Sequence, residues 1–329
     1  GTVPAIRASD LEVRIAALAD DRFEGRAPGS DIGELAADWI ALELARVGAR
    51  PAGENASWFQ TVDMIEQTLD EAASFIKFTT PNGNFIVPQL GDDVPLWTKR
   101  QAELQLHFAA SELVFVGYGV VAPEYSWDDY AGLDVRGKTV VMLVNDPGFA
   151  REDALFNGAA MTYYGRWTYK FEEAARQGAT GAILIHETVP ASYGWEVVQN
   201  SWSGAQADLI RADGGASRTL FESWISIDTA RTLFRAAGLD FEAQKKAARE
   251  TGFTAVPLPG VTTTGRILQS VDTKSSRNVI GALKGQTRPD EYVLVTAHWD
   301  HLGKKTGEKA GEPTQDFYRD DIFNGAVDN

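Results

Sequence analysis

Apolar residues near the amino terminus recur every three to four positions in two stretches, which predicts two amphipathic helices. The first begins at about Ser9 and runs to Asp20, and the second begins near Asp31 and ends before Gly48. From about Thr68 onward the pattern changes to short apolar runs between turn residues, which is typical of β-strands. The chain therefore combines helices with a sheet.

The strand-like runs in the middle of the chain are SFIKF (74–78), NFIVP (84–88), ELVFVGYGVV (112–121) and KTVVMLVND (138–146). A helix is expected over 167–177, and the apolar run GAILIHE (181–187) follows it. Strand, helix and strand in this order predict a crossover unit in a mixed sheet. Further helices are expected over 228–237 and 240–250.

Beyond Pro259 strand character returns in VTTTGRIL (261–268), RNVIGALKG (277–285) and EYVLVTAH (291–298). The segment YVLVTA is almost wholly apolar, which predicts a strand buried on both faces of the sheet. The expected fold class is α/β.

Composition narrows the chemistry. The 329 residues include 31 Lys and Arg against 46 Asp and Glu, a formal net charge of −15, which disfavours a nucleic-acid partner. Cysteine is absent, so any metal must be bound by histidine and carboxylate. No apolar run approaches the roughly 20 residues that span a bilayer, so no membrane span is expected.

One nucleotide-binding pattern can be set aside. Residues 132–139 match the phosphate-loop pattern G-x-x-x-x-G-K-T. That loop needs a helix amino terminus after it to direct backbone amides at phosphate, whereas a strand is expected here.

The segment AHWDHLG (297–303) is the strongest candidate for chemistry. Residues two apart in an extended chain face the same side, so His298 and Asp300 can share one face, where one binds a metal and the other orients it. The acidic run DDIFNGAVDN (320–329) supplies further carboxylates. Taken singly, each motif is more often a polar surface loop than a metal site. The remaining histidines, His107 and His186, are expected to be structural.

Together these motifs resemble the co-catalytic di-zinc aminopeptidases of metallopeptidase family 28. VTAHWDHLG and DDIFNGAVDN are similar to that family's first two metal-binding signatures. RFEGRAPGSDIGELAADWIALEL (22–44) and SRNVIGALKG (276–285) are similar to its amino-terminal helical region and to the segment before the metal strand.

The middle of the chain resembles the protease-associated domain often inserted in this family. The resemblance implies a partial zinc-exopeptidase core, a mixed sheet flanked by helices, with an inserted α+β domain. Residues 1–68 and 260–329 would form the core, and residues 69–259 would form the insert.

The resemblance assigns site residues by position. His298 would be a ligand of one zinc ion, Asp300 the carboxylate that orients it, and Asp328 the carboxylate that bridges two zinc ions. His301 receives no ligand role and is expected at the rim or in a structural position. Two zinc ions holding a bridging water would hydrolyse amino-terminal residues from peptides.

In the family a Glu-Glu pair, with the general base and a zinc ligand, follows the bridging aspartate, and further ligands follow the pair. This sequence places only Asn329 after Asp328. The general base is thus absent from the chain, which alone is expected to bind zinc weakly and to be inactive. A missing carboxyl-terminal segment of the same protein is an expected partner.

Other interpretations remain open: a carboxypeptidase or glutaminyl-cyclase-like enzyme on the same fold, or a non-catalytic receptor or scaffold. Tyr164, Arg166 and Trp167 are candidates for contacts with a peptide substrate. The expected location is secreted or periplasmic, with any signal peptide removed or not included.

Overall fold

The computed structural model describes residues 5–151, 153, 155–202, 204–304 and 321–326. It contains two compact units, Gly1–Met64 with Thr273–Asn329 and Ile65–Asp272, here called unit 1 and unit 2. Strands β2 (Phe59–Leu69) and β13 (Val256–Val279) each cross a boundary between the units. The assignment of 69–259 as a protease-associated domain stays a prediction.

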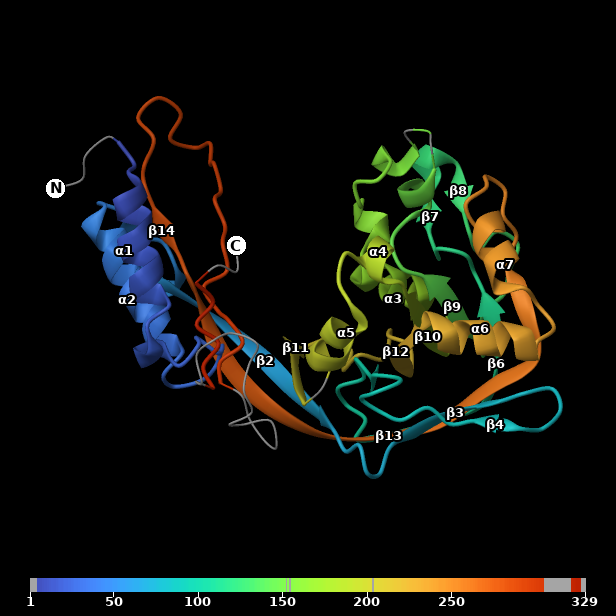
Figure 1. Cartoon of the computed structure of the whole chain (residues 1–329). Coiled ribbons are helices and arrows are strands. Elements are labelled where there is room, and N and C mark those ends of the chain that lie inside the picture. The colour runs from blue at the N-terminus through green and yellow to red at the C-terminus, as the bar shows by residue number, and fades with distance from the viewer. Residues whose placement is uncertain (1–4, 152, 154, 203, 305–320, 327–329) are drawn as a thin grey trace. The chain divides into compact units, whose positions relative to one another are not determined.

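Most strands belong to one mixed sheet in the order β11-β2-β13-β6-β9-β10-β12-β5, with β3 beside β13 and β4 beside β3 (Figure 1). The bounds of these strands are Phe75–Thr79 (β3), Phe85–Ile86 (β4), Leu96–Trp97 (β5), Gln105–Phe115 (β6), Thr139–Leu143 (β9), Gly181–His186 (β10), Ala205–Leu209 (β11) and Phe221–Ser226 (β12). Strands β6, β9, β10 and β12 run parallel to one another, whereas β13 pairs antiparallel with β6 and β5 pairs antiparallel with β12.

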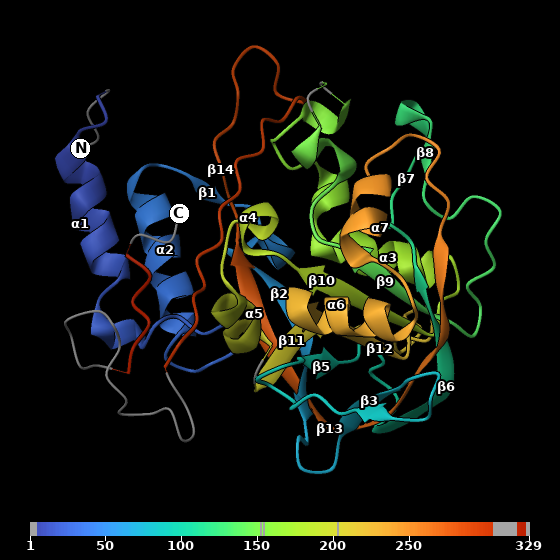
Figure 2. The same ribbon diagram turned by 45° about the vertical axis from the view of Figure 1, so that its right-hand side comes forward.

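Helices cover both faces of the parallel strands of unit 2 (Figure 2). Alternate residues of β9 and β10 point to opposite faces, because successive side chains of a strand do so. One face of β9 and β10 packs against α6 (Ile227–Ala236), where Leu233 and Phe234 contact Val141, Leu143, Ile183 and Ile185. The opposite face packs against α3 (Trp167–Arg176), where Phe171 and Ala174 contact Val140, Met142, Ala182 and Leu184. The predicted crossover from β9 through α3 to β10 is confirmed.

Smaller elements complete unit 2. They are β7 (Val121–Ala122), β8 (Trp127–Asp128), α4 (Thr188–Ala191), α5 (Trp195–Ser201) and α7 (Phe241–Ala247). Helices α6 and α7 confirm the two predicted after 227. No helix in the described part of the chain is long and apolar enough to cross a membrane.

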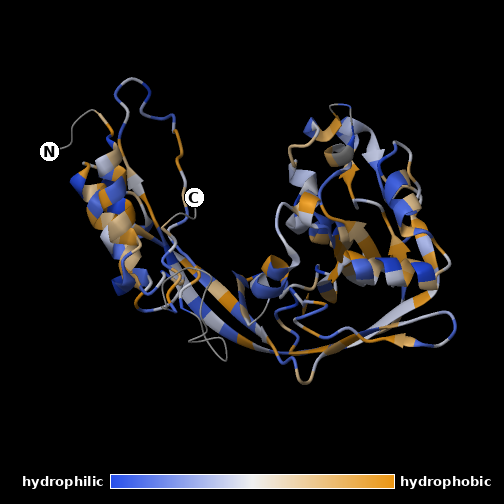
Figure 3. Ribbon diagram, viewed as in Figure 1, coloured by the Kyte–Doolittle hydropathy of each residue, from blue (hydrophilic) through white to orange (hydrophobic). Residues whose placement is uncertain are grey.

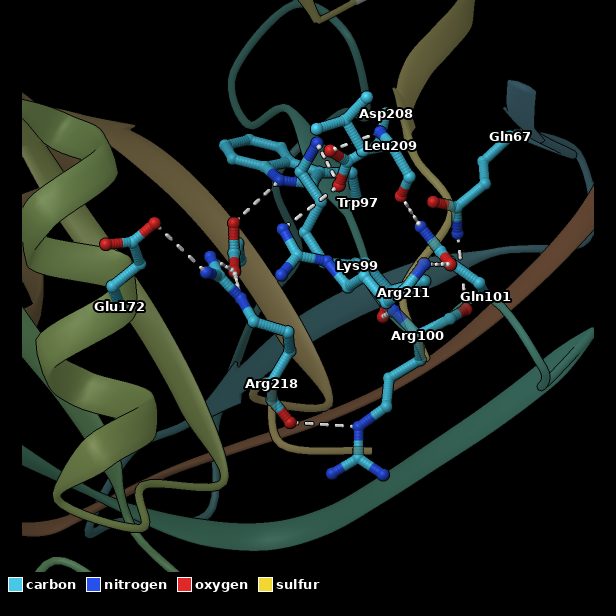
Figure 4. Close-up of polar contacts among 12 residues, drawn as sticks. Gln67, Trp97, Lys99, Arg100, Gln101, Glu172, Asp208, Leu209, Arg211 and Arg218 are labelled. Atoms are coloured by element: carbon cyan, nitrogen blue, oxygen red, sulfur yellow. Dashed lines mark hydrogen bonds and ion pairs between the residues drawn. The ribbon is translucent and has the colours of Figure 1, made fainter. Parts of the chain in front are cut away.

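A buried ion pair ties β12 to its surroundings in unit 2 (Figure 4). Glu222 is fully buried and accepts a hydrogen bond from Nη2 of Arg218 at 2.6 Å and from Nε1 of Trp97 at 3.1 Å. Arg218 also lies 3.6 Å from Glu172, and its backbone carbonyl accepts from Nε of Arg100 at 2.9 Å. These partners satisfy charges that would otherwise be costly to bury.

Unit 1 holds the two predicted amino-terminal helices, α1 (Ala8–Leu18) and α2 (Glu34–Arg46). Short strands β1 (Arg50–Pro51) and β14 (Gly281–Ala282) pair antiparallel. Arg277, near the end of β13, lies 3.0 Å from both Glu34 and Asp38 of α2. The ion pairs fix α2 to the segment that leads toward residue 298.

The predicted strand over YVLVTA is wrong. Residues 291–300 form no regular secondary structure, and the side chains of Tyr292, Val293, Leu294 and Val295 are 85–95% exposed. This segment is hydrophobic in Figure 3 although it lies in solvent. A strand is stabilised only by neighbours that take up its backbone hydrogen bonds, and no strand of the described residues pairs with it.

Candidate functional site

The side chains of His298 and Asp300 lie together in unit 1. Nδ1 of His298 is 2.9 Å from the backbone carbonyl oxygen of Asp300 and 3.6 Å from its Oδ1. A carbonyl oxygen can only accept, so Nδ1 carries a proton and donates it. In a neutral imidazole the lone pair is then on Nε2, the nitrogen that can bind a metal. Both side chains are about half exposed, at 49% and 44%.

Trp299, the residue between His298 and Asp300, is held in place by a hydrogen bond of its own. Nε1 of Trp299 donates to the backbone carbonyl of Arg277 at 3.0 Å. Arg277 is the residue that pairs with α2, so the His298–Asp300 segment is connected to a helix through two successive contacts. This anchoring replaces the predicted strand as the support of the site.

The turn that precedes Asp328 lies against the same segment of unit 1. The backbone N–H of Phe323 donates to the carbonyl of Gly303 at 2.8 Å, and Lys304 forms an isolated antiparallel bridge with Ile322. Nδ2 of Asn324 donates to the carbonyl of Ala19 at 2.7 Å and to Oδ1 of Asp21 at 2.8 Å. The structure thus brings the two sequence motifs together as far as Ala326.

Asp328 itself lies outside the described residues. Among the residues that the structure describes, no three His, Asp or Glu side chains form a group able to hold a metal ion. The donor chemistry of His298 and Asp300 nevertheless fits zinc, because metal-bound imidazole commonly donates its second N–H to a carboxylate or carbonyl. The fit covers one ligand, whereas a catalytic zinc site has three from the protein.

A third segment, the loop after the 3₁₀ helix Asp21–Phe23, contacts both motifs, and the sequence motifs assign it no role at the site. The N–H of His301 donates to the carbonyl of Arg26 at 3.0 Å, and the N–H of Gly303 donates to that of Gly25 at 2.9 Å. A Cβ on Gly25 would lie 2.2 Å from the carbonyl oxygen of Gly303. Glycine is therefore required for this approach, and the Gly-rich composition of the loop is a signal of it in the sequence.

The other two histidines lie in unit 2. His186 is buried, its Nε2 lies 3.0 Å from the carbonyl oxygen of Tyr193, and burial lowers its pKa. The exposed side chain of His107, on β6, pairs with Gln105 at 2.8 Å. Neither belongs to a cluster of metal-binding side chains among the described residues.

The aromatic residues expected to contact substrate also lie in unit 2. The Tyr164 hydroxyl donates to Oε1 of Glu124 at 2.6 Å, which raises the pKa of Tyr164 to about 12. Its ring packs edge-on against Tyr169 at 5.0 Å. Trp167 packs against Trp202 at 5.0 Å, and Arg166 is exposed. A role for Tyr164, Arg166 and Trp167 in substrate binding stays a prediction.

Comparison with known proteins gives a family match at the site. A model of peptidase family M28 matches residues 278–329, which include both motifs. No curated protein matches the sequence.

Two solved structures resemble the chain. An aminopeptidase from Aneurinibacillus sp. strain AM-1 is 17% identical with a TM-score of 0.39, covering 85% of this chain and 49% of that one. BSAP, a zinc aminopeptidase from Bacillus subtilis, is 12% identical with a TM-score of 0.32, covering 87% and 49%. The chain spans about half the length of these two proteins.

Proposed function

We propose that this chain carries the first ligands of the metal centre of a zinc-dependent aminopeptidase, which removes residues from the amino terminus of peptides. One observation carries the proposal: the segment that matches peptidase family M28 contains a histidine whose Nδ1 donates to Asp300. With the proton on Nδ1, the neutral form of this imidazole would bind a metal through Nε2.

Each residue then has one task in the reaction. His298 would bind zinc through Nε2, Asp300 would keep the proton on Nδ1, and Asp328 would bridge two ions. Bound zinc would polarise the scissile carbonyl and lower the pKa of a water molecule. We assign no general base within these 329 residues.

The number of ligands limits what the chain can do alone. His298 and Asp328 are two protein ligands, fewer than the three usual for catalytic zinc. We therefore propose that the chain by itself binds zinc weakly and does not hydrolyse peptides. A secreted or periplasmic location is part of the same proposal and follows from the family resemblance.

Zinc content and peptide hydrolysis test this function together. The full chain is dialysed against zinc, its metal content is measured, and hydrolysis of aminoacyl p-nitroanilides is followed. Weak, saturable binding without turnover is expected. Absence of zinc binding would contradict the metal site, whereas tight binding of two ions with turnover would support the aminopeptidase but contradict the expected inactivity of the chain.

A further inference from the structure

Three consecutive residues of unit 1, Glu24, Gly25 and Arg26, adopt left-handed backbone conformations, with φ of 47°, 71° and 53°. Two of these residues are not glycine, and such conformations persist only where the surroundings enforce them. Contacts with other segments of the chain must therefore offset the strain of this loop.

The guanidinium of Arg26 donates hydrogen bonds to backbone carbonyl oxygens of three segments. Nε donates to Trp299 at 2.9 Å, Nη1 donates to Leu18 at 2.6 Å and to Asn324 at 2.6 Å, and Nη2 lies 3.4 Å from the carbonyl of Gly325. Arg26 is only 5% exposed. A planar fork of five donors can hold several acceptors at fixed separations, which a lysine ammonium cannot reproduce.

We propose that Arg26 is the positioning residue of the candidate metal site, which holds the segment that carries His298 against the turn formed by residues 322–325. Trp299, whose carbonyl it binds, stands between His298 and Asp300. The inference rests on the proposed function, because it takes His298 as a zinc ligand.

The packing around Gly325 supports this role. Gly325 has a φ of 60°, and a Cβ placed on it would lie 2.7 Å from Nη2 of Arg26 and 2.6 Å from the His301 ring. The turn thus lies directly against both side chains. A side chain at position 325 would therefore displace the turn from the ring of His301, which received no ligand role.

The test compares Arg26→Gly with the wild-type chain. Glycine accepts a φ of 53° readily, so a loss in this variant reports the missing guanidinium rather than backbone strain. The matched control is Arg22→Ala, since Arg22 lies in the neighbouring 3₁₀ helix and its Nη2 is 3.4 Å from the carbonyl of Ala17. Two quantities are measured: zinc affinity by titration, and hydrogen exchange of the amides of His301, Gly303 and Phe323.

In Arg26→Gly we expect zinc affinity to fall by about tenfold or more, as for other residues that orient ligands. We also expect the three amides to exchange faster and millimolar guanidinium to restore part of both properties. Arg22→Ala should leave both unchanged. Arg26→Lys keeps the charge but not the planar fork of donors, so its zinc affinity and amide exchange should lie between those of the wild-type chain and Arg26→Gly. This variant replaces Arg26→Gly in the test if Arg26→Gly does not fold.

Zinc affinity and amide exchange that stay within about twofold of wild type in both Arg26 variants would overturn the proposal while leaving the proposed function intact. If the wild-type chain binds no zinc, the proposed function fails instead. Amide exchange then still reports whether Arg26 holds the three segments together, so the two failures are distinguishable.

Discussion

Nδ1 of His298 lies 2.9 Å from the backbone carbonyl oxygen of Asp300 and 3.6 Å from the Asp300 carboxylate. The backbone carbonyl therefore accepts the Nδ1 proton, whereas the carboxylate lies beyond hydrogen-bond distance and adds an electrostatic attraction that helps to orient the imidazole. The backbone carbonyl remains when the carboxylate is removed. This arrangement predicts a graded response to substitution.

Asp300→Asn should lower zinc affinity by about tenfold, at the lower end of the 10–100-fold effect of removing such partners, because the backbone acceptor persists. Zinc titration of the purified chain measures the change. Asp290→Asn, at an exposed position, removes the same charge and should have no effect. Equal affinity in the two variants would show that the Asp300 carboxylate does not orient His298.

The buried pair of Arg218 and Glu222 in unit 2 should contribute strongly to stability. Arg218→Met leaves the fully buried Glu222 without its cation, which should reduce the free energy of unfolding by about 3–5 kcal/mol. Chemical denaturation measures it. The control is Arg136→Met, whose ion pair with Asp134 is exposed and should contribute far less to stability. Similar losses in both would contradict the buried pairing.

His186 should make unit 2 less stable in acid. Burial lowers the pKa of His186 in the folded state below its usual 6.5. At pH values between the folded and the unfolded pKa, the unfolded state therefore binds a proton that the folded state does not. Stability contributed by neutral His186 is complete above about pH 6.5 and declines as the pH falls through that range. His186→Gln should therefore flatten the pH dependence of the unfolding midpoint. An unchanged slope would mean that His186 is accessible to protons in the folded chain.

The exposed apolar residues 292–295 should promote self-association. Extended apolar segments without neighbours pair readily with other chains. Val293, which is 95% exposed, can be replaced by lysine without loss of packing, so Val293→Lys should raise solubility and leave the unfolding midpoint unchanged. Light scattering and thermal unfolding check both. A marked loss of stability would show instead that Val293 is buried in solution.

Periodicity along the chain was sufficient for the crossover through α3 and for α6, since the apolar faces of these helices are encoded locally. It failed at YVLVTA, because a continuous apolar run indicates burial only when neighbouring strands exist, and neighbours are not visible in the segment itself. Periodicity also predicted two separate strands where the structure has the single strand β13. The polar stretch 269–276 between them is kept extended by its pairing with neighbouring strands.

At the site, the pairing of His298 with Asp300 follows from their spacing of two residues. The role of Arg26 does not, because its carbonyl partners lie as far as 299 positions away in the sequence. A left-handed conformation at Glu24 and Arg26 is equally hidden, since neither residue type favours it. Such features depend on tertiary contacts rather than on local pattern.

The most direct test of the central claim is zinc affinity measured side by side for the wild-type chain, His298→Ala and His107→Ala. Each variant removes one exposed histidine, but only His298 lies beside Asp300. We predict that saturable zinc binding is lost in His298→Ala and retained in His107→Ala. Equal zinc affinity in all three chains would contradict a metal site at His298.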